Sequence, residues 1–438
     1  MECKLFIFIL RIIQFFRGIL IPCLAFILFI FSKKLRSRYF FEDKNLTDKT
    51  KTFDKEANIA FEVSSEGEFE QIKPLLDSYL ERGFLIELIY SSDSLEDKIQ
   101  KLTAAHSNLR SLRLPILSYG IIQNDLLGFQ NISSWLTAKQ LILCRYDFYP
   151  ELLLYGLRKD VRFCLVSATF RNKTASWWNR SLYNSFDYIL AASREDKDKL
   201  MDLGIDANKL SSYEFRIPQI VERIANRSSK LKPYEGLIRL IESFPKEKRI
   251  IFGSAWSNEM EVFSDSQFAN EVIKRNLLIF VLPHQFNNEI REKLSSFPNF
   301  NVLTYKEGDD LNLLLEKYNK EPGVIILEVK GILLELYSYF GHSFIGGGHG
   351  RSVHSLLEPF LSGCHIYCGP KVHRSTEYDF IQSNAPKDLT IVKDLGSFYS
   401  VFSKIDGTDL SPSRLELGKN FASSFNEQAD RLTGGSLT

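Results

Sequence analysis

The stretch NIAFEVSSEGEFEQIKPLLDSYLE, residues 58–81, shows the pattern that decides the fold. It starts with an apolar run over 58–63, which predicts a buried strand, and continues with apolar residues at helical spacing over 68–81. Similar pairs of strand-like and helix-like runs follow along the chain. Strands that alternate with helices predict βαβ units, and therefore parallel sheets with helices on both faces.

These pairs fall into two series. Further strands of the first series are predicted over 84–90, 139–144, 162–166 and 186–191. Strands of the second are predicted over 249–253, 277–281, 301–304, 323–327, 342–345 and 365–368. We therefore expect an α/β protein with two doubly wound Rossmann-like domains facing a central cleft, a common scaffold for nucleotide-sugar enzymes. The N-terminal domain would cover 57–225 and the C-terminal domain 226–438, with the last helix as a candidate to pack back on the N-terminal domain.

The beginning of the chain differs from the rest in charge and hydropathy. Residues 1–38 carry seven Lys and Arg against one acid, a net charge of +6, whereas the remaining 400 residues carry 48 bases and 53 acids, a net charge of −5. The uninterrupted apolar run over 18–32 contains Pro22 and is shorter than the roughly 20 residues of a spanning helix. We expect residues 1–38 to be a membrane anchor that lies in the interface, with a tilted span as the alternative, and residues 39–56 to be a polar linker.

The charge pattern also indicates a location and excludes one class of partner. Lys33, Lys34, Arg36 and Arg38 directly follow the apolar run. They favour a body on the cytoplasmic side and contact with anionic lipid, and no small-residue cleavage site follows the run. An acidic body argues against a nucleic-acid partner, which would need a basic face. The six cysteines show neither a disulfide framework nor a zinc pattern, and those of the body are expected to be buried.

A glycine-rich segment, GGGHG at 346–350, follows the strand predicted over 342–345, and residues 352–361 are predicted to be a helix. Glycines allow a ligand to approach the backbone closely, and a helix start offers unpaired N–H groups and a positive dipole end. The segment therefore predicts a phosphate site, although it is neither a Walker loop nor a GxGxxG motif. A tight structural turn is the alternative.

A second polar segment, SSEGE at 64–68, lies between the first predicted strand and its helix. A carboxylate at the carboxyl end of a parallel strand lies where ligands bind, and it can act as a general base if it is desolvated. The alternative is a Ser N-cap with acids in the first helical turn, and from these residues alone the cap is favoured.

Three more polar segments follow predicted strands of the second series, at the edge where open α/β sheets bind ligands. They are SAWSNE at 254–259, Pro283-His284 and GPKVHR at 369–374. Each is a weak signal alone, and their shared position strengthens the prediction. His349, His354 and His373 have no second His or carboxylate at the spacing of a helical metal site, so we expect neither a metal nor a cofactor.

Taken together, these segments resemble those of the 3-deoxy-D-manno-octulosonic acid (Kdo) transferases over nearly the whole chain. The matching segments, in order, are SEGE at 65–68, RYDFYP at 145–150, GSAWSNE at 253–259, Pro283-His284, GGG at 346–348, HSLLEP at 354–359 and Gly369-Pro370. The resemblance implies a GT-B glycosyltransferase of lipopolysaccharide core biosynthesis at the inner membrane, facing the cytoplasm. It also implies CMP-Kdo as donor, a lipid A precursor (lipid IVA) as acceptor, and an inverting transfer that requires no metal.

The resemblance further implies roles for individual residues. Glu68 falls on the family's catalytic base, and Asp147 falls on an acid that assists the transition state. The residues implied for donor binding are Ser254, Pro283, His284, Gly331, Gly346, Gly347, Gly348, His354, Ser355, Glu358 and Arg374.

Three positions depart from the family pattern. Ser355 replaces an Asn, Tyr149 replaces a Trp, and Glu214 stands where a basic residue is expected, which Arg216 could replace from two positions away. Two alternatives therefore stay open: a GT-B enzyme that uses a UDP-sugar, and a catalytically degenerate membrane-associated binding protein. A diphosphate donor would need more basic residues near the glycine-rich segment, where Arg351 is the only candidate.

Overall fold

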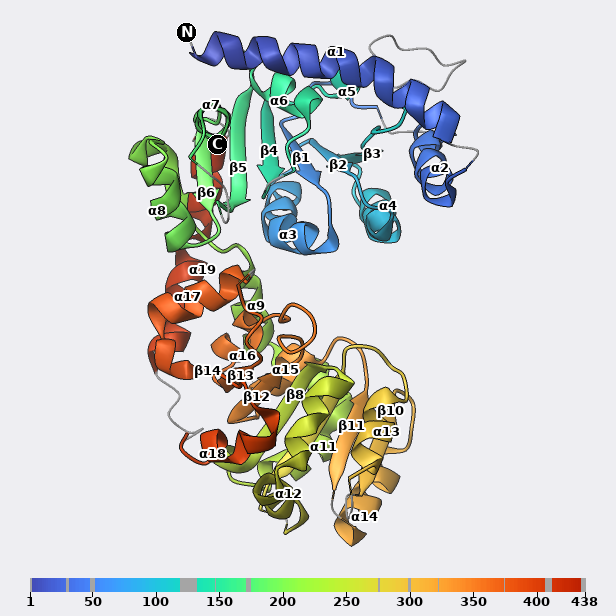
Figure 1. Cartoon of the computed structure of the whole chain (residues 1–438), viewed down its shortest axis with the longest axis vertical. Coiled ribbons are helices and arrows are strands. Elements are labelled where there is room, and N and C mark those ends of the chain that lie inside the picture. Colours follow the sequence, from blue (N-terminus) through green and yellow to red (C-terminus); the bar gives the residue numbers. More distant parts are fainter. Residues whose placement is uncertain are drawn as a thin grey trace. The chain divides into compact units, whose positions relative to one another are not determined.

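The computed structural model (Figure 1) describes two compact units. The first unit comprises Met1–Arg216 and Ser424–Thr438, and the second comprises Ile217–Ser423. The described residues are 2–28, 31–47, 52–118, 132–145, 147–170, 175–274, 276–297, 301–321, 323–373, 375–405 and 412–434. Helix α19 (Pro412–Thr433) begins in the second unit and ends in the first.

The first unit is built on a parallel seven-stranded sheet. Across the sheet, the strands are β3 (Leu109–Arg113), β2 (Ile86–Tyr90), β1 (Ile59–Val63), β4 (Gln140–Cys144), β5 (Arg162–Ala168), β6 (Tyr188–Ala191) and β7 (Leu210–Ser212). The order runs outward from β1 to β3 and then returns to β4 on the other side of β1, where Phe61 pairs with Ile142. The chain therefore has a topological switch point between β1 and β4, the place where open α/β sheets bind ligands.

In the part of the first unit that the structure describes, eight helices before α19 surround this sheet. They are α1 (Glu2–Leu28), α2 (Lys33–Thr47), α3 (Glu66–Glu81), α4 (Glu96–Ala105), α5 (Ile132–Trp135), α6 (Pro150–Gly156), α7 (Trp177–Asn184) and α8 (Arg194–Asp202). Helix α1 runs along α6 and α7 (Figure 1), with Phe6 and Leu10 buried in the same core as these helices. Its Arg17 forms an ion pair of 2.6 Å with the fully buried Glu151 of α6. In the described part of the chain, no helix is both long and apolar enough to cross a membrane.

The segment predicted to be a polar linker, residues 39–56, is helical up to Thr47. Its Glu42 is completely buried and accepts hydrogen bonds from the N–H groups of Leu117 and Ser118. The linker prediction was wrong for residues 39–47. Composition does not distinguish a polar side chain that forms hydrogen bonds inside the fold from one that is exposed to solvent.

The second unit repeats the architecture. Across its parallel sheet, the strands are β10 (Val302–Lys306), β11 (Val324–Glu328), β9 (Leu278–Pro283), β8 (Arg249–Ala255), β12 (His342–Ile345), β13 (His365–Cys368) and β14 (Leu389–Ile391). β8 has β9 on one side and β12 on the other, with Phe252 opposite Phe344. The switch point of this sheet therefore lies between β8 and β12.

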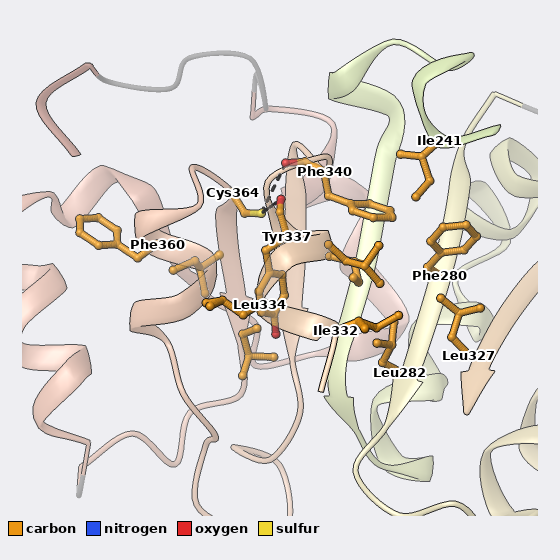
Figure 2. Close-up of a cluster of buried hydrophobic side chains, with 14 of the residues drawn as sticks. Ile241, Phe280, Leu282, Leu327, Ile332, Leu334, Tyr337, Phe340, Phe360 and Cys364 are labelled. Carbon is orange, nitrogen blue, oxygen red and sulfur yellow. Dashed lines mark hydrogen bonds between the residues drawn. The ribbon is translucent and has the colours of Figure 1, made fainter. Parts of the chain in front are cut away.

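Short helices surround the second sheet. They are α9 (Arg216–Ala225), α10 (Arg227–Leu231), α11 (Glu235–Glu242), α12 (Ser266–Ile273), α13 (Glu289–Ser295), α14 (Leu311–Lys320), α15 (Leu333–Tyr337), α16 (Leu357–Leu361), α17 (Thr376–Asn384) and α18 (Phe398–Phe402). Figure 2 shows part of the core, to which Phe280 and Leu282 of β9 and Leu334 and Tyr337 of α15 all belong. The thiol of Cys364 donates to the carbonyl oxygen of Tyr337 at 3.1 Å.

The strands predicted from the sequence are all present, and three more lie outside the predicted runs: β3, β7 and β14. All three are edge strands, which have a neighbour on one side only and need no continuous apolar run. The four cysteines of the body, Cys144, Cys164, Cys364 and Cys368, are buried and unpaired, as predicted.

Candidate active site

Glu68 lies at the switch point of the first sheet, in the first turn of α3. Its side chain is 2% exposed, and its Oε2 accepts a hydrogen bond of 2.7 Å from the N–H of Ser64. The N–H of Glu68 in turn donates to the Oγ of Ser65, the N-cap of the helix. The structure therefore contains the capping arrangement that the sequence favoured. It also buries the carboxylate, which a general base requires.

The electrostatic surroundings of Glu68 favour its protonated form. Burial raises the pKa of the Glu68 carboxyl to about 7, against the opposing hydrogen bond from Ser64. The charge of Asp147, which follows β4, raises this pKa further, and Arg145 lowers it. The structure thus brings Glu68 and Asp147 to the same edge of the sheet. A carboxyl that titrates near neutral pH can accept a proton and release it again.

Two neighbours of Glu68 are unusual. Glu62, on β1, is fully buried, and its Oε1 accepts a hydrogen bond of 2.7 Å from the hydroxyl of Ser64. Its Oε2 has no partner among the described residues, and burial raises the pKa of Glu62 well above its usual range. Arg145, at the end of β4, has a φ of 65°, a conformation that is strained for a residue other than glycine. Unpaired buried groups and backbone strain of this kind often mark functional sites.

The second group of candidate residues lies at the switch point of the second sheet. Here Glu259, which is 1% exposed, joins the loop after β8 to the loop after β12. Its Oε2 accepts from the N–H of Trp256 at 2.8 Å, and its Oε1 accepts from the N–H of Gly347 at 3.2 Å. We call this arrangement the Glu259 clamp.

The three glycines of the second loop are needed for close packing. A Cβ atom on Gly346 would lie 1.9 Å from the carbonyl oxygen of Ser254, which has a strained φ of 50°. Gly347 and Gly348 have positive φ values, and a Cβ atom on either would lie within 3 Å of backbone atoms. This segment can therefore take no side chain.

The helix predicted to follow these glycines starts later than expected. Residues 352–356 are not helical, and α16 begins at Leu357. The N–H groups of Leu356 and Leu357 donate to the carboxylate of Glu377, so they are not open to a phosphate. The predicted helix start was wrong because the carboxylate of Glu377 accepts the N–H groups at the true start. Glu377 is distant in the sequence, so the local sequence does not reveal this boundary.

Three aromatic rings stack at this edge. His284 and His354 have ring centroids 4.2 Å apart, and Trp256 lies 4.6 Å from His284. The indole N–H of Trp256 donates to Nε2 of His354 at 3.1 Å. Burial lowers the pKa of His354 to about 4, with contributions from His284 and Arg351, so this imidazole is neutral at pH 7. The stack offers a flat surface with few charges.

The remaining predicted residues lie in or near the same region. Pro283 ends β9, where it pairs with Ala255, and Ser355 lies half-buried before α16. Gly331 is exposed after β11 and has a φ of 79°. Glu358 is half-buried in α16; after burial itself, its charge is the largest cause that raises the pKa of Tyr337. Arg374 lies outside the described residues.

Five residues of these sites received no role of their own in the sequence-based prediction. Glu62 lay outside every segment singled out for function, whereas Glu259, Trp256, Arg145 and Tyr149 lay within such segments. The Tyr149 ring is stacked beneath Arg17 of α1 at 5.6 Å. A buried acid directly before or after a predicted loop, as at Glu62 and Glu259, is the signal that could have found two of them. Among the described residues, no group of three or more His, Cys, Asp and Glu side chains could hold a metal ion.

The first unit matches a known family. Residues 33–214 match the family model described as 3-deoxy-D-manno-octulosonic-acid transferase (kdotransferase). No curated protein matches the chain.

Solved structures match the fold at low identity. UDP-GlcNAc 2-epimerase from Methanocaldococcus jannaschii is 12% identical, with a TM-score of 0.51 and coverage of 80% of this chain and 93% of that chain. A glycosyltransferase from Rickettsia africae is 12% identical, with a TM-score of 0.50 and coverage of 87% and 99%. The C-terminal CMP-Kdo binding domain of WaaA from Acinetobacter baumannii is 14% identical. The match covers 48% of this chain and 97% of that chain, with a TM-score of 0.28. The first two matches show a GT-B-like fold.

Proposed function

Residues 33–214 belong to the 3-deoxy-D-manno-octulosonic-acid transferase family, and from this premise we propose that the chain transfers Kdo from CMP-Kdo to a lipid A precursor. The observation that carries the proposal is the buried Glu68 at the switch point of the first sheet, with a pKa of about 7. An inverting transfer needs a base that is ionised in a large fraction of molecules at neutral pH and still accepts a proton well.

In the proposed reaction, Glu68 removes the proton from a sugar hydroxyl of the acceptor. The oxygen attacks the anomeric carbon of Kdo from the face opposite CMP, the bond from that carbon to the phosphate oxygen breaks, and CMP leaves with the bonding electrons. Asp147 would stabilise the positive charge that develops on the sugar.

The second unit would hold CMP. The neutral stack of His284 and His354 supports a place for the cytosine beside Pro283, because an aromatic base stacks well on flat, uncharged rings. Glu358 would accept hydrogen bonds from the ribose hydroxyls. Ser254, Gly331, the glycines at 346–348, Ser355 and Arg374 complete the proposed donor site by resemblance to the family.

The experiment is a transfer assay with the full chain, CMP-Kdo generated in situ and a tetra-acylated lipid A precursor. A product heavier than the acceptor by one or more Kdo units is the expected result. Glu68→Gln should lower turnover by about 10² to 10⁴. Glu66→Gln is the matched control, since Glu66 is exposed in the same helical turn and should change turnover less than twofold.

Other outcomes would redirect the assignment. A product with a UDP-sugar but not with CMP-Kdo would indicate another GT-B transferase. Binding of CMP without any product would indicate a degenerate binding protein, and full activity of Glu68→Gln would remove Glu68 from the mechanism.

We also propose that α1 lies in the interface of an anionic membrane. Six of its apolar side chains are at least half exposed: Leu5, Phe8, Phe15, Phe16, Leu20 and Leu24. Lys33 and Lys34, directly after the apolar segment, are exposed too. An apolar helix face flanked by cations is typical of a helix that lies flat at an anionic surface. This arrangement would bring the protein to an acceptor that is itself a lipid.

A further inference from the structure

The glycine-rich loop has no unpaired N–H group at its three glycines. The N–H of Gly346 donates to the carbonyl of Gly253, that of Gly347 to Glu259, and that of Gly348 to the carbonyl of Arg351. The N–H groups at the start of α16 donate to Glu377. An oxyanion bound here must therefore be held by other donors, because each of these N–H groups already has a partner.

Arg351 offers such donors. Its guanidinium carbon lies 4.0 Å above the ring of Trp256, and its side chain is exposed. Within the described part of the chain, its guanidinium forms no hydrogen bond and no ion pair. Stacking uses the flat face of a guanidinium and leaves the N–H donors at its edge available for a ligand.

The surface that carries Arg351 is held in place. The Glu259 clamp fixes the backbone of Trp256, and the bond from the indole N–H to His354 fixes the ring. The two histidines beside it are kept neutral: burial lowers the pKa of His284, and the charge of Arg351 lowers it further. Arg351 therefore supplies the positive charge at this stack, in an orientation set by the ring below it.

We propose that Arg351, stacked on Trp256, binds an oxyanion of the donor substrate, a phosphate or a carboxylate, through two parallel N–H donors. The identity of the donor rests on the proposed function, since CMP-Kdo carries one phosphate and one carboxylate. The proposal adds a binding residue outside the segments matched to the family, and it gives the loop glycines a packing role.

The test measures binding rather than transfer. CMP, cytidine and free Kdo are titrated calorimetrically into the full-length wild type, Arg351→Ala and Arg351→Lys. The wild type should bind CMP more tightly than cytidine, and Arg351→Ala should weaken either CMP or Kdo at least about tenfold, with cytidine unchanged. Arg351→Lys should lose most of the same affinity, because lysine can neither stack nor form two parallel bonds.

Arg291→Ala is the matched control, since Arg291 is an exposed arginine of α13 in the same unit. It should bind every ligand as the wild type does. Weakening confined to CMP assigns Arg351 to the phosphate, and weakening confined to Kdo assigns it to the carboxylate. Three results would overturn the proposal. Arg351→Ala could bind CMP and Kdo as tightly as the wild type, or Arg291→Ala could lose as much affinity as Arg351→Ala. The third is a wild type that binds neither CMP nor Kdo.

The outcome is separable from that of the transfer assay. Binding that depends on Arg351 in a protein that transfers no Kdo would leave this inference standing and refute the proposed function. If the protein transfers Kdo but Arg351→Ala changes neither the CMP nor the Kdo affinity, the proposed function stands and the role of Arg351 is refuted.

Discussion

At the residue scale, Glu68 combines a structural and a chemical role. Its carboxylate accepts the Ser64 N–H at the start of α3, which stabilises the helix, and the same burial raises its pKa to about 7. An ionised carboxylate held in such a place costs folding free energy. Active sites often retain a group that destabilises the fold in this way, because the burial that lowers stability also makes the group reactive.

The pH dependence of activity follows from this pKa. Glu68 must have lost its proton to act as a base, so kcat/KM should rise as the pH increases through about 7 and then level off. Initial rates between pH 5.5 and 8.5, with Glu66→Gln as control, would measure this. A flat profile over this range would exclude Glu68 as the base.

The same pKa predicts a stability difference of defined sign. The folded pKa lies above the ordinary value of 4.5, so this group contributes stability at low pH that is lost between about pH 4.5 and 7. Glu68→Gln should therefore be more stable than the wild type at pH 8, by about 3 kcal/mol, and similar at pH 4.5. Denaturant unfolding at both pH values measures the difference. A variant that is less stable at pH 8 would show that the capping role dominates.

At the element scale, the Glu259 clamp connects two loops that are distant in the sequence. The carboxylate belongs to the short 3-10 helix Ser257–Ser264, and the Gly347 that it holds follows β12. Loops after neighbouring strands have few backbone partners of their own, so a buried carboxylate between them can define their geometry.

Removal of the clamp should affect stability and ligand affinity together. Glu259→Ala leaves two N–H groups without an acceptor and should cost about 2 to 4 kcal/mol of unfolding free energy. It should also weaken CMP binding, because the Trp256 ring and the glycine loop lose their common anchor. Glu261→Ala is the matched control, since the Glu261 side chain is 46% exposed in the same short helix and forms a surface ion pair with Lys293. Wild-type CMP affinity in a folded Glu259→Ala variant would contradict this role.

Two elements show where local sequence was insufficient. Helix α2 begins within the predicted anchor and extends into the predicted linker, because buried Glu42 is satisfied by N–H groups of residues 117 and 118. Helix α16 starts five residues after the predicted start, because Glu377 accepts the N–H groups at its beginning. In both cases the deciding partner comes from a distant part of the chain.

At the scale of the whole molecule, α1 is part of the first unit and also carries most of the exposed large apolar side chains among the described residues. Phe6 and Leu10 pack into the core, and Arg17 pairs with the fully buried Glu151. Deletion of the helix would expose that core and leave a buried carboxylate unpaired, which typically costs several kcal/mol. Membrane binding is therefore better tested with substitutions on the exposed face.

The triple variant Phe8→Ser, Phe15→Ser and Phe16→Ser should bind anionic phospholipid vesicles at least about a hundredfold more weakly than the wild type. The three side chains are 60%, 52% and 53% exposed, so the fold should tolerate the change. Leu313→Ser, at a 48% exposed position of α14, is the control and should bind vesicles normally. Flotation of the full chain measures the bound fraction, and equal flotation of the triple variant would refute the proposed orientation.

The sequence by itself determined the α/β class, the two series of strands and the polar segments at their carboxyl ends. Apolar runs and turn residues are local properties, and a parallel strand buried on both faces must be apolar in any context. The same local pattern singled out Glu68, His284 and the glycine-rich segment, whereas Asp147 was named only through the resemblance to the family. The local pattern missed three of the four edge strands, β3, β7 and β14, whose residues meet weaker burial constraints.

Only the tertiary structure decided which of these segments are neighbours. It joined β1 to β4 and β8 to β12, and so brought Glu68 to Asp147 and Trp256 to His354. It also raised the pKa of Glu68, gave the glycine N–H groups partners inside the protein and placed Arg351 over Trp256. Burial and hydrogen bonding depend on side chains that are distant in the sequence and meet only when the chain is folded, so no local pattern could determine them.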